Sequence, residues 1–164
     1  MSVTSVDRDD DDLTITLIAD FAAPIDQVWD LWSDPRKLER WLGPPTHPAS
    51  VEKHDLTAGG EITFFMTGPE GDRSWGRWRV TAVDPPIWVE FSDAFADGDG
   101  TPIADMPVSK IRVQLTERGG GTRMEIRSAF ESREDMEKSV SIGTVEGLQQ
   151  AVGQMDALLA LCDS

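Results

Sequence analysis

The sequence predicts a single α+β domain in which a curved antiparallel sheet wraps around a C-terminal helix. Apolar residues recur every three or four positions from Val145 to Cys162, which is the period of one helical face. Residues 51–130 instead contain short β-type segments separated by glycine and proline turns. A chain of 164 residues is typical of one domain and can bury a sizeable core.

The C-terminal stretch, residues 131–162, is the part around which the rest is organised. The helix expected at 145–162 would be roughly 25 Å long, at about 1.5 Å per residue. Its apolar face needs a broad apolar partner, and the chain before it offers mainly strands. The residues on that face are Val145, Leu148, Val152, Met155, Leu159 and Cys162.

The first residues differ in character from the rest of the chain. Residues 1–12 are polar and include the acidic run 9–12, so we expect a disordered acidic tail there. Residues 13–162 would then form the single domain. Alternating apolar residues at 13–21 predict its first strand.

Two short helices are expected after this strand. Pro24 suits the first turn of a helix that carries Trp29, and Asp34-Pro35 ends it and opens a second helix that carries Trp41. Both tryptophans are expected to pack in the core at one end of the sheet. Turn signals then delimit further strands, giving about six or seven in all; these are 51–56, 61–67, 74–83, 87–95, 108–117 and 122–130.

Composition excludes several classes of function. The formal net charge of −15 opposes non-specific binding to nucleic acid or anionic membrane, since both require basic surface. No apolar run approaches the roughly 20 residues of a membrane span, so no membrane insertion is expected. Cys162 is the only cysteine, which excludes an internal disulfide and favours a cytoplasmic location.

An ordered succession of short motifs spans residues 13–160. They include Phe21-Ala22-Ala23-Pro24, Val28-Trp29, Asp34-Pro35, Gly59-Gly60, Pro85-Pro86, Leu115-Thr116-Glu117, Gly120-Gly121-Thr122 and Glu146-Gly147-Leu148. On these the chain resembles the family of activator of heat-shock-protein-90 ATPase homologues, in the START-like (SRPBCC) helix-grip superfamily. The resemblance implies a helix-grip fold. The family often carries a tryptophan where this chain has Leu148, which predicts more room inside the grip.

The sequence offers no complete catalytic or metal-binding set. His47 and His54 are the only histidines, and no metal-ligand spacing links them. Cys162 lies at the end of a helix, where the helix dipole raises a thiol pKa rather than lowering it. We therefore expect no metal, no cofactor and no catalytic residue that can be named.

Large apolar side chains on the strands and the last helix predict a ligand site instead. Our first hypothesis is non-enzymatic binding of a small hydrophobic or amphipathic molecule between the sheet and the C-terminal helix, although a sealed core would use the same residues. The expected lining is Phe64, Met66, Trp78, Val80, Phe91, Met124, Leu148, Val152 and Met155.

Two alternatives remain open, and both follow from the resemblance. One is a protein-interaction module related to chaperone ATPase activators. The other is a cyclase- or dehydratase-type enzyme, which would need an inward carboxylate or histidine with a perturbed pKa. The candidates for that group are Asp55, Glu90 and His54; Arg77, Arg112 and Glu90 are expected outside unless a bulge turns one inward.

Exposed aromatic residues would also suit a homodimer. Trp75, Trp88 and Phe95 are expected at outer or edge positions, where aromatic side chains often mark contacts.

Overall fold

The computed structural model describes residues 3–43, 45–98, 101–104 and 106–162. Its strands form one antiparallel eight-stranded sheet in the order β1-β2-β8-β7-β6-β5-β4-β3. The strands are β1 (Val3–Asp9), β2 (Thr14–Phe21), β3 (Ala49–His54), β4 (Glu61–Thr67), β5 (Arg73–Asp84), β6 (Trp88–Ala96), β7 (Val108–Arg118) and β8 (Gly121–Phe130). The helices are α1 (Ile25–Ser33), α2 (Pro35–Leu42), α3 (Arg133–Ser141), α4 (Thr144–Gly153) and α5 (Met155–Cys162).

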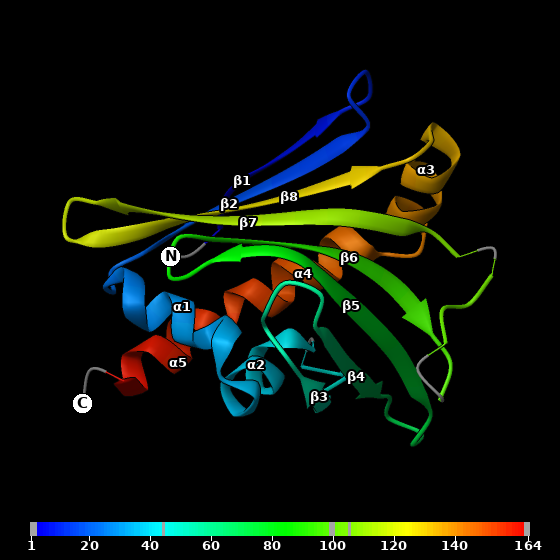
Figure 1. Cartoon of the computed structure of the whole chain (residues 1–164), viewed down its shortest axis with the longest axis horizontal. Helices are drawn as coiled ribbons and strands as arrows, with labels where there is room; N and C mark the ends of the chain where they lie inside the picture. The colour runs from blue at the N-terminus through cyan, green and yellow to red at the C-terminus, as the bar shows by residue number, and fades with distance from the viewer. Residues whose placement is uncertain (1–2, 44, 99–100, 105, 163–164) are drawn as a thin grey trace.

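The sheet curves around the helices, as Figure 1 shows. Helices α1 and α2 connect β2 to β3; α1 lies against β7 and β8, and α2 lies against β3. Helices α4 and α5 run under the same face, while α3 stands beyond the end of β8. The predicted α+β architecture, a curved antiparallel sheet with a C-terminal helix, is thereby confirmed.

The junction of α1 and α2 forms as the sequence predicts. The Asp34 carboxylate accepts hydrogen bonds from the backbone N–H groups of Arg36 and Lys37, which caps α2, and Pro35 occupies its first turn. Trp29 and Trp41 are buried, as expected. Within the described residues, no helix is both long and apolar enough to cross a membrane.

The sheet has eight strands rather than the six or seven expected, and β1 accounts for the difference. Val3–Asp9 pairs with β2, whereas residues 1–12 were expected to be disordered. A bulge between Val3 and Ser5 shifts the register, so Val3 and Val6, three residues apart, both pack against the core. This spacing hides the two-residue period from a sequence-based prediction.

The acidic run forms the turn of the β1–β2 hairpin. Asp9 Oδ1 accepts the backbone N–H groups of Asp11 and Asp12 at 3.0 and 3.1 Å, and Asp10 pairs with Arg8. A carboxylate that satisfies the following backbone N–H groups stabilises a tight turn. These carboxylates therefore have a local structural role.

The C-terminal region is helical but interrupted. The expected apolar face is present, with Val152, Met155 and Leu159 buried and Val145 and Leu148 half-buried. The helix breaks at Gln154, whose side-chain N–H groups donate to the carbonyl oxygens of Trp41 and Gly43 at 3.1 and 2.6 Å. The side chain of Cys162 lies outside the described part of the structure.

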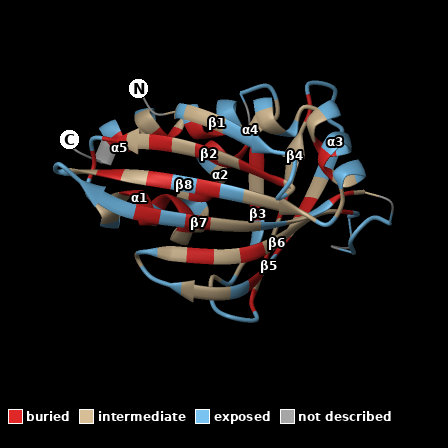
Figure 2. Cartoon of the chain, turned by 90° about the horizontal axis from the view of Figure 1, so that it is seen from above, coloured by how far each residue is buried: buried red, intermediate tan, exposed pale blue. Residues whose placement is uncertain are grey.

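Buried residues concentrate on the middle of the sheet and on the helices beneath it. Figure 2 shows buried segments along β2, β7 and β8, with exposed residues toward the loops. Strand registers place alternate residues of β4 to β8 on the concave face, where they meet the helices. A site between sheet and helices must be built from these residues, from those that β1 and β2 turn to the same face, and from the helices themselves.

Candidate ligand-binding site

An aromatic cluster occupies the concave face beneath β4, β5 and β6. The Trp78 and Phe91 rings stack with their centroids 4.3 Å apart, and Phe64 lies edge-on to Trp78 at 5.4 Å. Trp32 of α1 lies 6.0 Å from Trp78 and 4.7 Å from Trp41 of α2. Such ring contacts stabilise the fold beyond what burial of the apolar area alone contributes. This half of the interior is filled.

Glycine at position 76 allows one of these rings to pack. A Cβ atom there would lie 2.4 Å from Cζ of Phe64, closer than a real contact. The two helix tryptophans that join the cluster differ in hydrogen bonding. Trp41 Nε1–H donates to the Leu31 carbonyl at 2.8 Å, whereas Trp32 Nε1 has no partner in the described structure. The cluster therefore contains one buried donor that is not satisfied by the protein.

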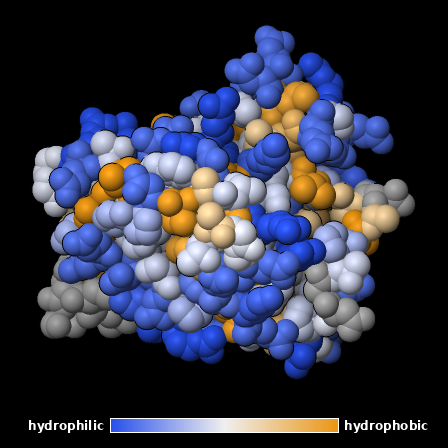
Figure 3. All heavy atoms as spheres, in the orientation of Figure 1, coloured by the Kyte–Doolittle hydropathy of each residue, from blue (hydrophilic) through white to orange (hydrophobic). Residues whose placement is uncertain are grey.

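A small apolar hollow lies at the other end of the concave face. Its volume is about 20 Å³. It is lined by Val6 of β1, Ile15 and Leu17 of β2, Ser128 and Phe130 of β8, Ser139 of α3, and Thr144, Val145 and Leu148 of α4. Figure 3 shows apolar side chains gathered between the β1–β2 hairpin and α3 on a mostly hydrophilic face. This is the half of the interior that the aromatic cluster does not fill.

One carboxyl group faces the concave side between these two halves. Asp93 pairs with Trp78 on β5 and Ser109 on β7, so it shares the inward face of β6 with Val89 and Phe91. Burial raises the pKa of Asp93 to about 6, although a hydrogen bond from the Trp78 indole opposes the rise. The residue as a whole is half-buried.

Carboxylates on the convex face show the opposite behaviour. Arg123 donates to both oxygens of Asp20, at 2.8 and 3.0 Å, and holds the pKa of that carboxyl below its ordinary value. Arg77 likewise hydrogen-bonds Glu61 and lowers its pKa. Asp93 has no such cationic partner among its described contacts, which distinguishes it from these structural ion pairs.

Comparison with known proteins now identifies the family. The profile of "Activator of Hsp90 ATPase homolog 1-like protein" matches residues 22–160, most of the chain. The chain belongs to this family. No functionally curated protein matches the sequence significantly.

Solved structures of bacterial proteins agree with this family assignment. A Mycobacterium smegmatis protein is 46% identical, with a TM-score of 0.90 and 96% of each chain covered. An Arthrobacter aurescens protein is 43% identical, with a TM-score of 0.93, covering 97% of this chain and 92% of that one. The AHSA1 protein of Silicibacter pomeroyi is 26% identical, with a TM-score of 0.71, covering 90% and 98%.

Within this family fold, the predicted lining residues divide between the two halves. Phe64, Trp78 and Phe91 belong to the aromatic cluster. Leu148 lines the hollow. The remaining predicted residues lie in or against the same core: Val80, Met124, Val152 and Met155 are buried, and Met66 is partly buried.

Of the polar residues singled out in the sequence, Glu90, Arg112 and Asp55 lie on outer or exposed positions, whereas the register of β3 places His54 on the concave face, opposite Ile62 of β4. Arg112 pairs with Glu90 outside the grip, and exposed Asp55 accepts the Thr57 hydroxyl at 2.6 Å. His54 Nε2 lies 3.0 Å from the Trp32 carbonyl. The inward carboxylate is Asp93, which sequence analysis missed. Its two-residue spacing from Phe91 was the signal that could have found it.

The aromatic residues proposed for a dimer contact also have partners within the chain. Trp75 lies 4.8 Å from Phe65, and Arg112 lies over Trp88 at 4.5 Å. Phe95 pairs with Gly76 and so takes the concave face rather than an outer position, since Trp78 and Asp93 beside them face inward. The homodimer stays a prediction.

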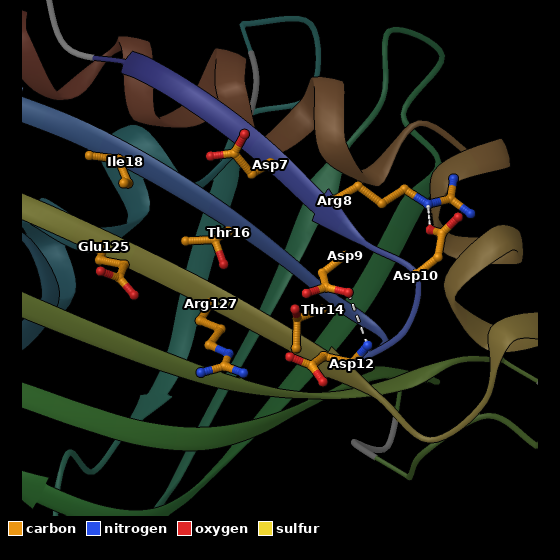
Figure 4. A pocket seen from close by; sticks show the side chains of 10 residues that line it. All are labelled: Asp7, Arg8, Asp9, Asp10, Asp12, Thr14, Thr16, Ile18, Glu125 and Arg127. Carbon is orange, nitrogen blue, oxygen red and sulfur yellow. Dashed lines mark hydrogen bonds and ion pairs between the residues drawn. The ribbon is translucent and has the colours of Figure 1, made fainter.

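A second surface depression is an open, polar area on the outside of the sheet. Figure 4 shows its side chains, which come from the β1–β2 hairpin and β8. Its volume is about 670 Å³, and its lining includes Asp7, Asp9, Asp12 and Arg127. In the described ranges, no three His, Cys, Asp or Glu side chains are placed so that they could hold a metal ion.

Proposed function

We propose that this chain binds a small hydrophobic or amphipathic molecule, without transforming it, in the hollow between β2, β8 and α4. The observation that carries the proposal is the lining itself. Apolar side chains from strands and helices meet there, and the hydroxyls of Ser128, Ser139 and Thr144 lie among them. Apolar walls with a few polar groups are typical of small-molecule sites.

The hollow must widen to accept such a molecule. A volume of about 20 Å³ corresponds to little more than one water, whereas ligand pockets are typically about 300 Å³ or larger. We propose that the wall formed by α3 and α4 moves to widen the hollow. It contains Gly143, with φ of 87°, at the helix junction, and Gly147, whose added Cβ would meet no atom within 4 Å.

A substitution at Leu148 tests the proposal. Leu148→Trp should fill the hollow, so decanol should raise the melting temperature of the natural chain but not of the variant. Ile142→Trp is the matched control, because Ile142 is 48% exposed outside the hollow. Binding by the natural chain and the control alone supports the proposal. No response of the natural chain, or an equal response of Leu148→Trp, contradicts it.

Asp93 favours a second candidate function, an enzyme that transfers a proton to or from a bound molecule. A carboxyl with a pKa of about 6 is suited to general acid–base catalysis near neutral pH. Binding is the better-supported function, because the residues paired with Asp93 on the neighbouring strands, Trp78 and Ser109, are not ionisable, and His54 of β3 is engaged by the Trp32 carbonyl. Activation of a chaperone ATPase would rest on the family description alone.

A further inference from the structure

Asp93 is an isolated acidic group on an otherwise apolar and hydroxyl-bearing surface. Along β6, the concave positions are Val89, Phe91, Asp93 and Phe95. The facing positions on β5 and β7 nearest to Asp93 are Trp78 and Ser109. An ionised carboxylate on such a surface loses hydration and gains only hydrogen bonds, unless a cation is supplied.

A continuous row of paired residues leads from Asp93 to the hollow. Asp93 pairs with Ser109 on β7, and Ser109 pairs with Phe130 on β8, which lines the hollow. Neighbouring strands lie about 4.8 Å apart, so Asp93 and Phe130 are separated by roughly 10 Å across the sheet. A molecule of moderate length can therefore reach both.

We propose that Asp93 is the anchor for a positively charged head group, and that the ligands of this site are cationic amphiphiles such as long-chain amines. The ammonium group pairs with the Asp93 carboxylate beside Ser109, and the apolar tail extends over β7 into the hollow at Phe130 and Leu148. This inference rests on the proposed function and adds the charge of its ligand.

The charge of the molecule favours the same class of ligand. A formal net charge of −15 attracts cations and repels anions before contact is made. Fatty acids, the anionic counterparts of long-chain amines, would bring a second carboxylate beside Asp93. Like charges on a surface of low polarity are destabilising, so a carboxylate head group is disfavoured at this position.

Isothermal titration calorimetry at pH 7.5 with decylamine, decanol and decanoate tests the inference. Decylamine should bind about tenfold or more tightly than decanol, since hydrogen bonds to charged groups are the stronger ones, and decanoate most weakly. Asp93→Asn should remove the advantage of decylamine. Glu90→Gln, which removes the same charge from the outer face of β6, should retain it.

The outcomes separate this inference from the proposal on which it rests. Equal binding of decylamine and decanol by the natural chain, or an amine preference that survives in Asp93→Asn, overturns the role of Asp93 while leaving the hollow as a ligand site. Absence of binding by all of the probes overturns the proposed function and the inference together. Circular dichroism of Asp93→Asn verifies that the variant is folded.

Discussion

The two halves of the concave face have the same architecture but different interiors. Under β4, β5 and β6, the rings of Phe64, Trp78 and Phe91 interlock with Trp32 of α1. Under β2 and β8, mostly aliphatic and hydroxyl side chains, with Phe130, meet α3 and α4 and leave a hollow. The difference shows that one continuous sheet surface can be closely packed with aromatic rings at one end and leave a small hollow at the other.

This difference also indicates in which half the interior can open for a ligand at the lower cost in free energy. Opening the aromatic half would separate stacked rings and expose apolar area, which costs about 25 cal/mol per Å². Opening the other half would displace α3 and α4, which meet at Gly143. We therefore expect the largest effects of substitution on stability in the first half and the largest effects on binding in the second.

The largest expected effect comes from truncating a ring in the filled half. Phe91→Ala should reduce the free energy of unfolding by about 3–5 kcal/mol, because Phe91 is 3% exposed and touches two tryptophans. Phe130→Ala is the matched change at the half-buried wall of the hollow, and it should reduce the free energy of unfolding by a smaller amount. Urea denaturation measures both. Equal losses would remove the distinction between the halves.

Asp93 at the boundary should make stability depend on pH. Its folded pKa of about 6 lies above its ordinary value of 3.8, so its contribution to stability is fully present below about pH 4 and is lost as pH rises through 6. Asp93→Asn should therefore be more stable than the natural chain at pH 7.5, by at most about 3 kcal/mol. The advantage should shrink at pH 4.5.

Thermal unfolding of both proteins across this pH range checks the sign. A natural chain that is more stable than Asp93→Asn at pH 7.5 would mean that the carboxylate is stabilised by the fold. Glu90→Gln on the outer face serves as the control for the loss of one negative charge.

Glycines in the two halves should respond oppositely to alanine. Gly76→Ala should cost about 1–3 kcal/mol, because the new methyl group would overlap the Phe64 ring. Gly147→Ala in α4 should stabilise by up to about 1 kcal/mol, since its methyl group meets no atom and alanine favours helix. The same denaturation experiment compares them, and a tolerated Gly76→Ala would show that the aromatic cluster is loosely packed.

The smallest expected effect separates two tryptophans of the filled half. Trp41→Phe removes a buried hydrogen bond to Leu31, whereas Trp32→Phe removes an indole N–H that has no described partner. Both changes remove similar volume. Trp41→Phe should therefore be the more destabilising by about 1 kcal/mol, measured as the difference in urea midpoints. The reverse order would show that Trp32 has an unrecognised partner.

Much of the fold could be predicted from local patterns. The apolar stripe from Val145 to Leu159, the turns between strands and the Asp34-Pro35 junction reflect periods and caps that the sequence displays directly. The bulge at Val3 disguised β1, and the break at Gln154 depends on carbonyl groups more than a hundred residues away. Such tertiary contacts leave no local signal.

The candidate site was less predictable for a related reason. Strand parity placed Phe64, Trp78 and Phe91 on the concave face, but whether they fill it depends on Trp32, which arrives from α1. Asp93 was predictable in principle, because the alternation of side chains along β6 is enough to assign it to the concave face. A charged residue at an inward position was there to be found in the sequence.

Methyl NMR during a decanol titration tests most directly where ligand enters the grip. Our account predicts shifts at Ile15, Leu17, Val145 and Leu148 around the hollow, with Ile62 and Val80 beside the aromatic cluster unchanged. Shifts centred on Ile62 and Val80 would place the ligand among the tryptophans and contradict it.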